Sequence, residues 1–110
     1  MMLAVGLMSG TSLDGVDAVL CEITGKDETT TVKQLHFKTY EIPEHLRNKI
    51  RKCCSRECIP VDLICSLNFE LGYLFADAVK SLCQDADIAS EDLSFIASHG
   101  QTIFHIPKAY

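Results

Sequence analysis

The sequence is poor in the residues and runs that mark several protein classes. Only 6 of its 110 residues are glycine and 3 are proline, while 47% are hydrophobic, which excludes collagen-like and intrinsically disordered chains. The longest uncharged apolar stretch, residues 1–12, is too short to cross a bilayer, and no basic segment precedes it as in a secretory signal peptide. We therefore expect a soluble globular piece of about one small domain that has no membrane partner.

Basic residues are also in short supply. Ten Lys and Arg stand against 15 Asp and Glu, and the resulting formal charge of −5 argues against a nucleic-acid-binding protein. Residues 44–58 are the exception, because five basic and two acidic side chains give this segment +3 and leave −8 on the rest. We interpret the segment as a solvated helix face rather than as a surface for an anion or a partner.

The cysteines lack the paired spacing of a structural zinc site. There is no C-x-x-C pair, and the nearest histidine, His45, precedes Cys53 by eight residues. No secretion signal favours disulfides, so we interpret the cysteines as reduced thiols of a cytoplasmic protein. Several of the six are expected to be buried: Cys21, Cys53, Cys54, Cys58, Cys65 and Cys83.

Hydrophobic patterning predicts three strands and then two helices. Residues 2–8 are apolar without a break, which predicts a strand buried on both faces, and residues 16–23 alternate as a second strand. Residues 29–40 are rich in β-branched and aromatic side chains and predict a third strand, so that two turns give an antiparallel meander. Pro43 and Pro60 suit the first turns of the two helices.

Each predicted helix has an apolar stripe for the core. The first contains Leu46, Ile50 and either Cys53 or Cys54 at helical spacing. The stripe of the second is interpreted as core packing and consists of Ile64, Leu67, Leu71, Leu74, Phe75, Ala78 and Leu82. A short strand over residues 93–97 completes the order β-β-β-α-α-β of an α/β layer fold, with the fourth strand beside the first. Such a sheet normally needs more strands, so we expect residues 1–110 to be a fragment, the N-terminal part of an incomplete first domain.

The loop between the first two strands is the first candidate site. The glycines of Gly10-Thr11-Ser12-Leu13-Asp14-Gly15 let backbone N–H groups turn toward an anion, and the hydroxyls of Thr11 and Ser12 suit phosphate oxygens. Asp14 and Asp17 would repel a phosphate unless a cation such as Mg²⁺ lies between them. The loop therefore fits a nucleotide-phosphate site with magnesium, although it equally fits an ordinary β-turn at Asp14-Gly15. Neither a Walker loop nor a G-x-G-x-x-G pattern is present.

The second candidate site is the run Ser98-His99-Gly100-Gln101-Thr102, which follows the last predicted strand. Sites in open α/β sheets gather beyond the carboxyl ends of strands, and His99 and Gln101 can both donate and accept hydrogen bonds to a ligand such as a sugar. The alternative is a turn with a structural histidine. His105 follows closely and could join the site. A Ser/His/Asp hydrolase is set aside because the G-x-S-x-G elbow is missing and Ser98 adjoins its own base.

Both clusters together resemble the family of anhydro-N-acetylmuramic acid kinases. The resemblance lies in residues 6–17 (GLMSGTSLDGVD) and 98–105 (SHGQTIFH), and in residues 71–79 (LGYLFADAV), which resemble the long helix of the family. It covers essentially the whole chain but only about the first third of such an enzyme. It implies a ribonuclease-H-like fold of the actin, sugar-kinase and heat-shock-70 type, with ATP bound between two domains.

The resemblance also implies an activity and a set of site residues. The implied kinase uses ATP and water to open the anhydro ring of a small amino sugar, 1,6-anhydro-N-acetylmuramic acid, and yields N-acetylmuramic acid 6-phosphate in cell-wall recycling. Asp14 or Asp17 would help to bind Mg²⁺, and Ser98, His99 and Gln101 would lie near the sugar. A homodimer of the full-length protein is compatible with it. The stretch that would bind the ATP phosphates consists of Gly10, Thr11, Ser12, Leu13, Asp14, Gly15, Val16 and Asp17.

One catalytic part is expected outside this sequence. The aspartate that acts as general base in the family should lie beyond Tyr110, as should the second domain, so the fragment alone is predicted to be inert. The alternative is a non-catalytic fragment, or a remnant that binds a partner through unpaired strand edges.

Overall fold

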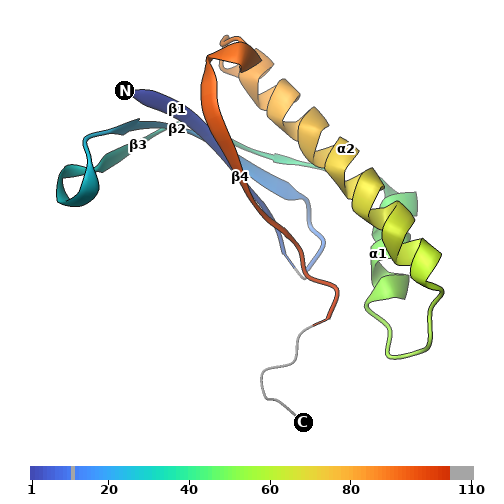
Figure 1. Cartoon of the computed structure of the whole chain (residues 1–110). Coiled ribbons are helices and arrows are strands. Elements are labelled where there is room, and N and C mark those ends of the chain that lie inside the picture. The colour runs from blue at the N-terminus through green and yellow to red at the C-terminus, as the bar shows by residue number, and fades with distance from the viewer. Residues whose placement is uncertain (11, 105–110) are drawn as a thin grey trace.

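In the part of the chain that the structure describes, a four-stranded sheet carries both α-helices on one face (Figure 1). The computed structural model describes residues 1–10 and 12–104. The α/β class and the order β-β-β-α-α-β predicted from the sequence are confirmed, with two short 3₁₀ helices added. In chain order the elements are β1 (Met2–Ser9), β2 (Val16–Thr24), η1 (Asp27–Thr29), β3 (Thr31–Tyr40), α1 (Glu44–Cys53), α2 (Val61–Asp85), η2 (Ser90–Asp92) and β4 (Leu93–Gln101).

The strand order places both candidate sites at one edge of the sheet. The order is β3-β2-β1-β4; β1, β2 and β3 form the predicted antiparallel meander, while β4 runs parallel to β1. The expectation that the fourth strand lies beside the first is therefore confirmed. Because parallel neighbours end at the same edge, the loop that leaves β1 and the last residues of β4 lie close together.

The core lies between the sheet and the helices. On β2, Val16, Ala18 and Leu20 are at most 1% exposed, which confirms the predicted alternation. In α1 the buried cysteine is Cys53, while Cys54 is exposed. The predicted stripe of α2 is buried in part, and Ile64 at its N-terminal end is exposed. The other helix residues buried in this core are Leu46, Ile50, Leu67, Leu71, Ala78, Val79, Leu82 and Cys83.

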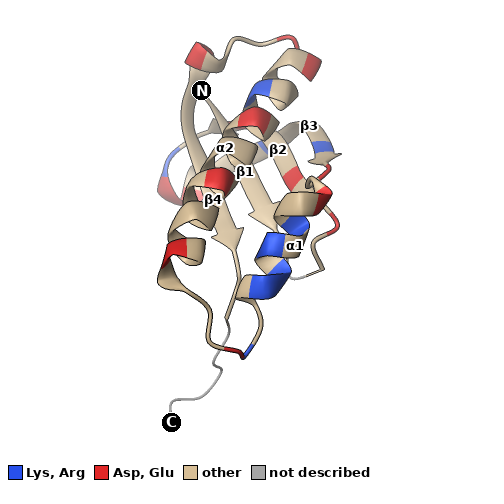
Figure 2. Ribbon diagram, turned by 90° about the vertical axis from the view of Figure 1, so that its right-hand side faces the viewer, with Lys and Arg blue, Asp and Glu red and all other residues tan. Residues whose placement is uncertain are grey.

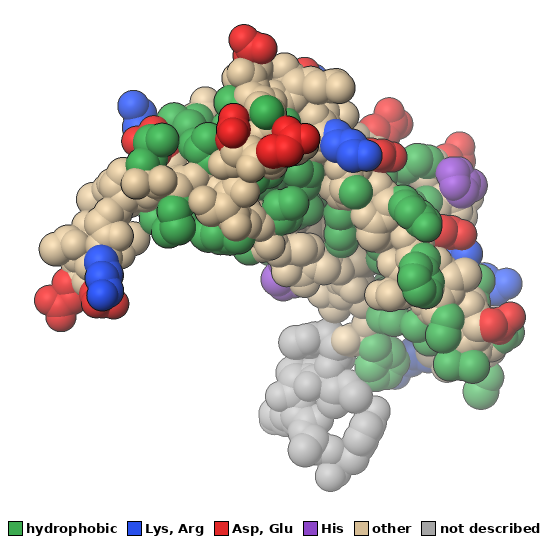
Figure 3. Space-filling view, turned by 45° about the horizontal axis from the view of Figure 1, so that its top comes forward, with side chains coloured by type: hydrophobic (Ala, Val, Ile, Leu, Met, Phe, Trp, Pro, Cys, Tyr) green, Lys and Arg blue, Asp and Glu red, His purple; other side chains and the backbone are tan. Residues whose placement is uncertain are grey.

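The expectation that residues 2–8 are buried on both faces is wrong. Met2 and Met8 are 42% and 52% exposed, because the described part of the chain provides helices for only one face of the sheet. An unbroken apolar strand is typical of a sheet covered on both faces. Apolar side chains are exposed on the surface (Figure 3). On α2, Phe69 and Tyr73 are 68% and 72% exposed. None of the described helices is long and apolar enough to cross a membrane.

The strand β4 extends further than predicted. Its register against β1 shifts by one residue between the pairs Leu7↔Ser98 and Ser9↔Gln101, which defines a β-bulge. Gly100 lies in this bulge with φ +76°, a backbone conformation that favours glycine. The polar run that suggested a turn is therefore the bulged end of a strand.

The basic segment lies largely on α1, whereas the charged residues of α2 are mostly acidic (Figure 2). One lysine of the basic segment also joins the two helices, because Lys49 Nζ lies 2.7 Å from Glu70 Oε1 of α2. The interpretation of this segment as a solvated helix face thus needs one addition, a contact between the two helices.

Asp85 at the end of α2 forms hydrogen bonds to β3. Its Oδ2 accepts hydrogen bonds from Lys38 Nζ at 3.2 Å and from the Tyr40 hydroxyl at 3.1 Å. These bonds lower the pKa of Asp85, and burial together with the bond to Asp85 raises the pKa of Tyr40 to about 12.

The raised pKa of Tyr40 predicts an alkaline loss of stability. The folded state keeps the phenol proton, so its contribution is present below the ordinary pKa of 10.0 and is lost as the pH rises toward 12. A Tyr40→Phe variant should lack this loss. Urea unfolding of both proteins between about pH 8 and pH 11 measures it, and parallel pH profiles would contradict the assignment.

Candidate functional site

The loop between β1 and β2 is anchored by a buried leucine. The Leu13 N–H donates to the Gly10 carbonyl oxygen at 3.3 Å, and the Leu13 side chain is 5% exposed although its φ is +58°. Ser12 and Asp14 on either side of it are exposed. The core thus fixes the middle of the loop while a hydroxyl and a carboxylate remain available to a ligand. Thr11 lies outside the described residues, as does His105.

Gly15 is required where β3 approaches the end of the loop. A Cβ at this position would lie 2.6 Å from Thr39 Cγ2 and 2.8 Å from the Tyr40 carbonyl oxygen. The second neighbour is backbone and cannot rotate away. The glycine therefore lets the loop pack directly against the strand.

A Gly15→Ala variant should be destabilised by about 1–3 kcal/mol, the usual cost of overpacking. Gly72 of α2 provides the matched control, because a Cβ there has no neighbour within 4 Å. Gly72→Ala should stabilise the helix by about 0.5–1 kcal/mol. Thermal unfolding of the two variants should therefore shift in opposite directions, and equal shifts would contradict the close approach at Gly15.

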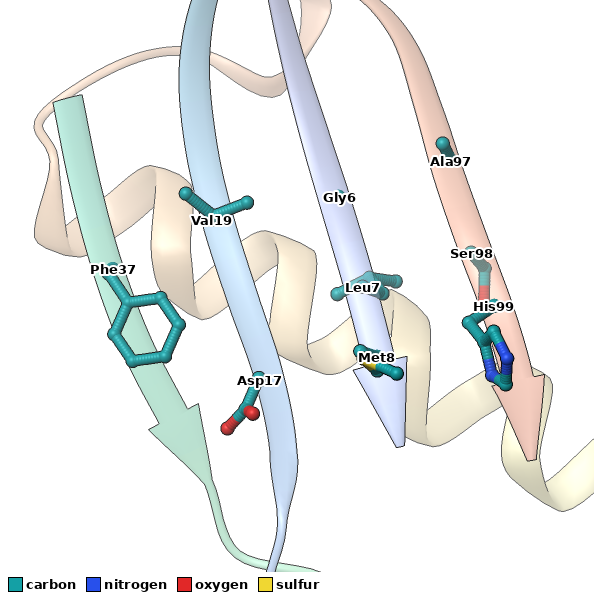
Figure 4. A pocket seen from close by; sticks show the side chains of 9 residues that line it. All are labelled: Gly6, Leu7, Met8, Asp17, Val19, Phe37, Ala97, Ser98 and His99. Atoms are coloured by element: carbon teal, nitrogen blue, oxygen red, sulfur yellow. The ribbon is translucent and has the colours of Figure 1, made fainter. Parts of the chain in front are cut away.

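Asp17 and His99 reach the same hollow from the two sequence clusters. The hollow lies on the open face of the sheet and has a volume of about 540 Å³; its floor is apolar, and Asp17 lies at one side and His99 at the other (Figure 4). Asp17 Oδ1 accepts a hydrogen bond from Thr39 Oγ1 at 2.6 Å. The His99 side chain is exposed and free to meet a ligand. The lining residues are Gly6, Leu7, Met8, Asp17, Val19, Phe37, Ala97, Ser98 and His99.

The two clusters are also joined by hydrogen bonds. The Ser9 hydroxyl, which is fully buried, donates to Gln101 Oε1 at 2.5 Å. Gln101 Nε2 donates to the carbonyl oxygens of Gly10 at 3.3 Å and Thr102 at 3.0 Å. Sequence reasoning missed Ser9, and the available signal was a hydroxyl at the end of an otherwise apolar strand.

Ser98 makes a local contact instead. Its Oγ accepts the Gly100 N–H at 3.0 Å, within the bulge. This bond uses one acceptor site of the hydroxyl and leaves its proton free, since a serine hydroxyl has one donor and two lone pairs. The Ser98 hydroxyl therefore keeps its proton for another acceptor.

Metal binding at the loop would depend on few protein ligands. Across residues 1–10 and 12–104, no three His, Cys, Asp or Glu side chains come together. Asp14 and Asp17 are both exposed, and two carboxylates suit Mg²⁺, which keeps several waters and shares phosphate oxygens. The residues present thus fit a magnesium–phosphate group better than a closed metal cage.

The cysteines are all free. Partial desolvation raises the pKa of Cys54, although its side chain is exposed, and burial raises the pKa of Cys83, which disfavours the nucleophilic thiolate at both positions. Cys53 and Cys83 are the two that are fully buried. The thiols of Cys54 and Cys83 are therefore poor nucleophiles.

Comparison with known proteins gives one consistent result. A model of the anhydro-N-acetylmuramic acid kinase family matches residues 2–110. The anhydro-N-acetylmuramic acid kinase of Clostridioides difficile strain 630 is 62% identical over 109 residues, which are 99% of this chain but 28% of the relative. Those of Bacillus cereus strain Q1 and Bacillus thuringiensis subsp. konkukian strain 97-27 are each 48% identical over 107 residues and are covered to the same 28%. The chain thus spans just over a quarter of the length of these kinases, and it belongs to the anhydro-N-acetylmuramic acid kinase family.

Proposed function

We propose that the chain provides the phosphate-binding loop and part of the sugar site of an ATP-dependent sugar kinase. The substrate is 1,6-anhydro-N-acetylmuramic acid, and the product is N-acetylmuramic acid 6-phosphate. The observation that supports this most directly is the meeting of the two clusters at one edge of the sheet, through Ser9, Gly10 and Gln101. A phosphoryl donor and its acceptor must lie side by side, and this edge offers adjacent surfaces for both.

In this reaction water adds to the anomeric carbon as the bond from that carbon to the 6-oxygen breaks. The 6-oxygen takes the γ-phosphoryl group of ATP, and ADP leaves. The loop from Gly10 to Asp17 binds the phosphates through backbone N–H groups and the hydroxyls of Thr11 and Ser12. Mg²⁺, when bound, neutralises phosphate charge, and Asp14 and Asp17 are its proposed ligands.

His99 and Ser98 form the sugar side of the proposal. Both line the hollow, and the exposed imidazole of His99 can donate to or accept from a sugar hydroxyl. Residues 1–110 are then the first part of the first kinase domain. The general base and the remaining nucleotide contacts are supplied by sequence beyond Tyr110, in a cytoplasmic enzyme that forms a homodimer. Residues 1–110 alone should be inert.

The test is ADP release with Mg-ATP by the protein expressed from its complete reading frame. The expected result is release that depends on the anhydro sugar and falls about 100-fold or more in Asp14→Asn. Asp87→Asn is the matched control, because Asp87 is an exposed aspartate just after α2 and should leave the rate unchanged. A folded product without sugar-dependent release would favour the alternative, a partner-binding remnant of such a kinase.

A further inference from the structure

We propose that Gln101 is a positioning residue that holds the phosphate loop in place, and that it does not bind the sugar. This inference rests on the proposed function, and it changes the role that the sequence suggested for Gln101. Its basis is the set of three hydrogen bonds that the Gln101 amide makes to Ser9, Gly10 and Thr102.

The amide has no hydrogen left for a substrate. A glutamine amide has two N–H donors, and Gln101 Nε2 donates to two main-chain carbonyl oxygens, those of Gly10 at 3.3 Å and Thr102 at 3.0 Å. Two carbonyl acceptors on one side also fix which end of the amide is nitrogen, because the reversed orientation would place three oxygens together. Only one lone pair of Oε1 remains beside the bond from Ser9.

The Ser9 hydroxyl, which donates to Gln101 Oε1, is out of reach of bulk water. The Ser9 hydroxyl is 0% exposed, and a buried hydroxyl without a partner is costly. Gln101 supplies the acceptor from a strand 92 residues away along the chain. The bond is therefore a required part of the packing between β1 and β4 at this edge.

The bulge at Gly100 turns Gln101 toward this contact. Side chains alternate between the faces of a strand, so a one-residue shift in register exchanges the face on which a side chain lies. The shift before Gln101 pairs it with Ser9 and not with Gly10, and this puts its side chain on the helix-covered face with the buried hydroxyl. His99, before the bulge, remains at the hollow on the open face.

The contact acts on the residue that begins the loop. The Gly10 carbonyl oxygen accepts two hydrogen bonds, one from Gln101 and one from the Leu13 N–H that closes the turn. Loss of Gln101 would release the Gly10 carbonyl group, which stands at the start of the proposed phosphate-binding stretch. Nucleotide binding should therefore suffer while sugar binding does not.

The experiment is a double-mutant cycle in the protein from the complete reading frame, with Ser9→Ala, Gln101→Ala and the double variant. Each single variant should raise KM for ATP about tenfold. The double variant should raise it by the same amount as either single variant, because both substitutions disrupt the same connected set of hydrogen bonds. KM for the anhydro sugar should change less than about twofold. A raised sugar KM in Gln101→Ala alone, or additive single effects on ATP, would overturn the proposal.

A near-isosteric variant distinguishes loss of these hydrogen bonds from simple misfolding. Gln101→Glu keeps the acceptor for Ser9 but, when ionised, donates to neither carbonyl, and its protonated form regains one donor. Its KM for ATP relative to the parent protein should therefore fall as the pH is lowered through the titration of the new carboxyl. A ratio independent of pH would contradict positioning by donation.

Hydrogen exchange separates this inference from the proposed function. If the protein releases no ADP, the kinase proposal fails, but exchange of the Leu13 amide still reports on the loop. Gln101→Ala should speed exchange at Leu13 about tenfold and leave the amide of Ala78 in α2 unchanged. Unchanged exchange at Leu13 would overturn the positioning role whatever the activity.

Discussion

A Gly10→Val variant is expected to lose about 100-fold or more in kcat/KM for sugar phosphorylation while its fold is retained, the scale of loss that follows from a misplaced reactant. The described part of the chain leaves room for a Cβ on Gly10, whose nearest neighbour would be Ser12 Oγ at 4.0 Å. Gly10 is also not among the glycines with positive φ in the described chain. The added methyl groups would instead occupy the space where, in the proposed function, phosphate oxygens approach the backbone.

Kinetics together with circular dichroism and thermal unfolding test this prediction. Gly72→Val is the control, because Gly72 is exposed on α2 and has no neighbour within 4 Å of a Cβ. It should keep kcat/KM at the parental level. Full activity of Gly10→Val would mean that the loop does not approach the nucleotide and is the ordinary β-turn that the sequence also allowed.

The largest expected effect on stability belongs to Leu20→Ala. Leu20 is 1% exposed on β2 and faces the helices, so its truncation leaves a cavity in the core and should cost about 2–5 kcal/mol. Small domains have total stabilities of only about 5–15 kcal/mol. A large share of the variant should therefore unfold at a denaturant concentration that the parent protein tolerates.

Urea unfolding measures this loss. Val32→Ala on β3 serves as the control, because Val32 is 63% exposed and its truncation should change the unfolding free energy by less than about 1 kcal/mol. Equal destabilisation by both substitutions would show that Leu20 does not lie in the cooperative core.

The parts of the fold that follow a hydrophobic period were predictable from the sequence. The alternation of Val16, Ala18 and Leu20 is the period of a half-buried strand, and the structure buries all three. The end of β4 was not predictable in the same way. A glycine among polar residues indicates a turn and a bulge equally well, and only the pairing with β1 distinguishes them.

The candidate site also has parts that the sequence predicts and parts that depend on strand pairing. The residue types of both clusters indicated ligand binding, and their likeness to a kinase family agreed with the comparison. The bond between Ser9 and Gln101 depends on register across β1 and β4, and a slip of one residue would reverse the face of either side chain. Such a contact depends on how distant strands pair, and the pattern of neighbouring residues in the sequence does not predict it.

The pairing of the first strand with the last described one also sets the order in which the loop is completed during synthesis. The hairpins β1–β2 and β2–β3 join neighbouring segments and can form as soon as residues 1–40 have left the ribosome. The partner of Ser9 is made 92 residues later, so the nascent hairpin first exists without its support. If the loop binds nucleotide as proposed, nucleotide would begin to stabilise the growing chain only after β4 has docked, and the loop between β1 and β2 would be among the last parts of this sheet to mature.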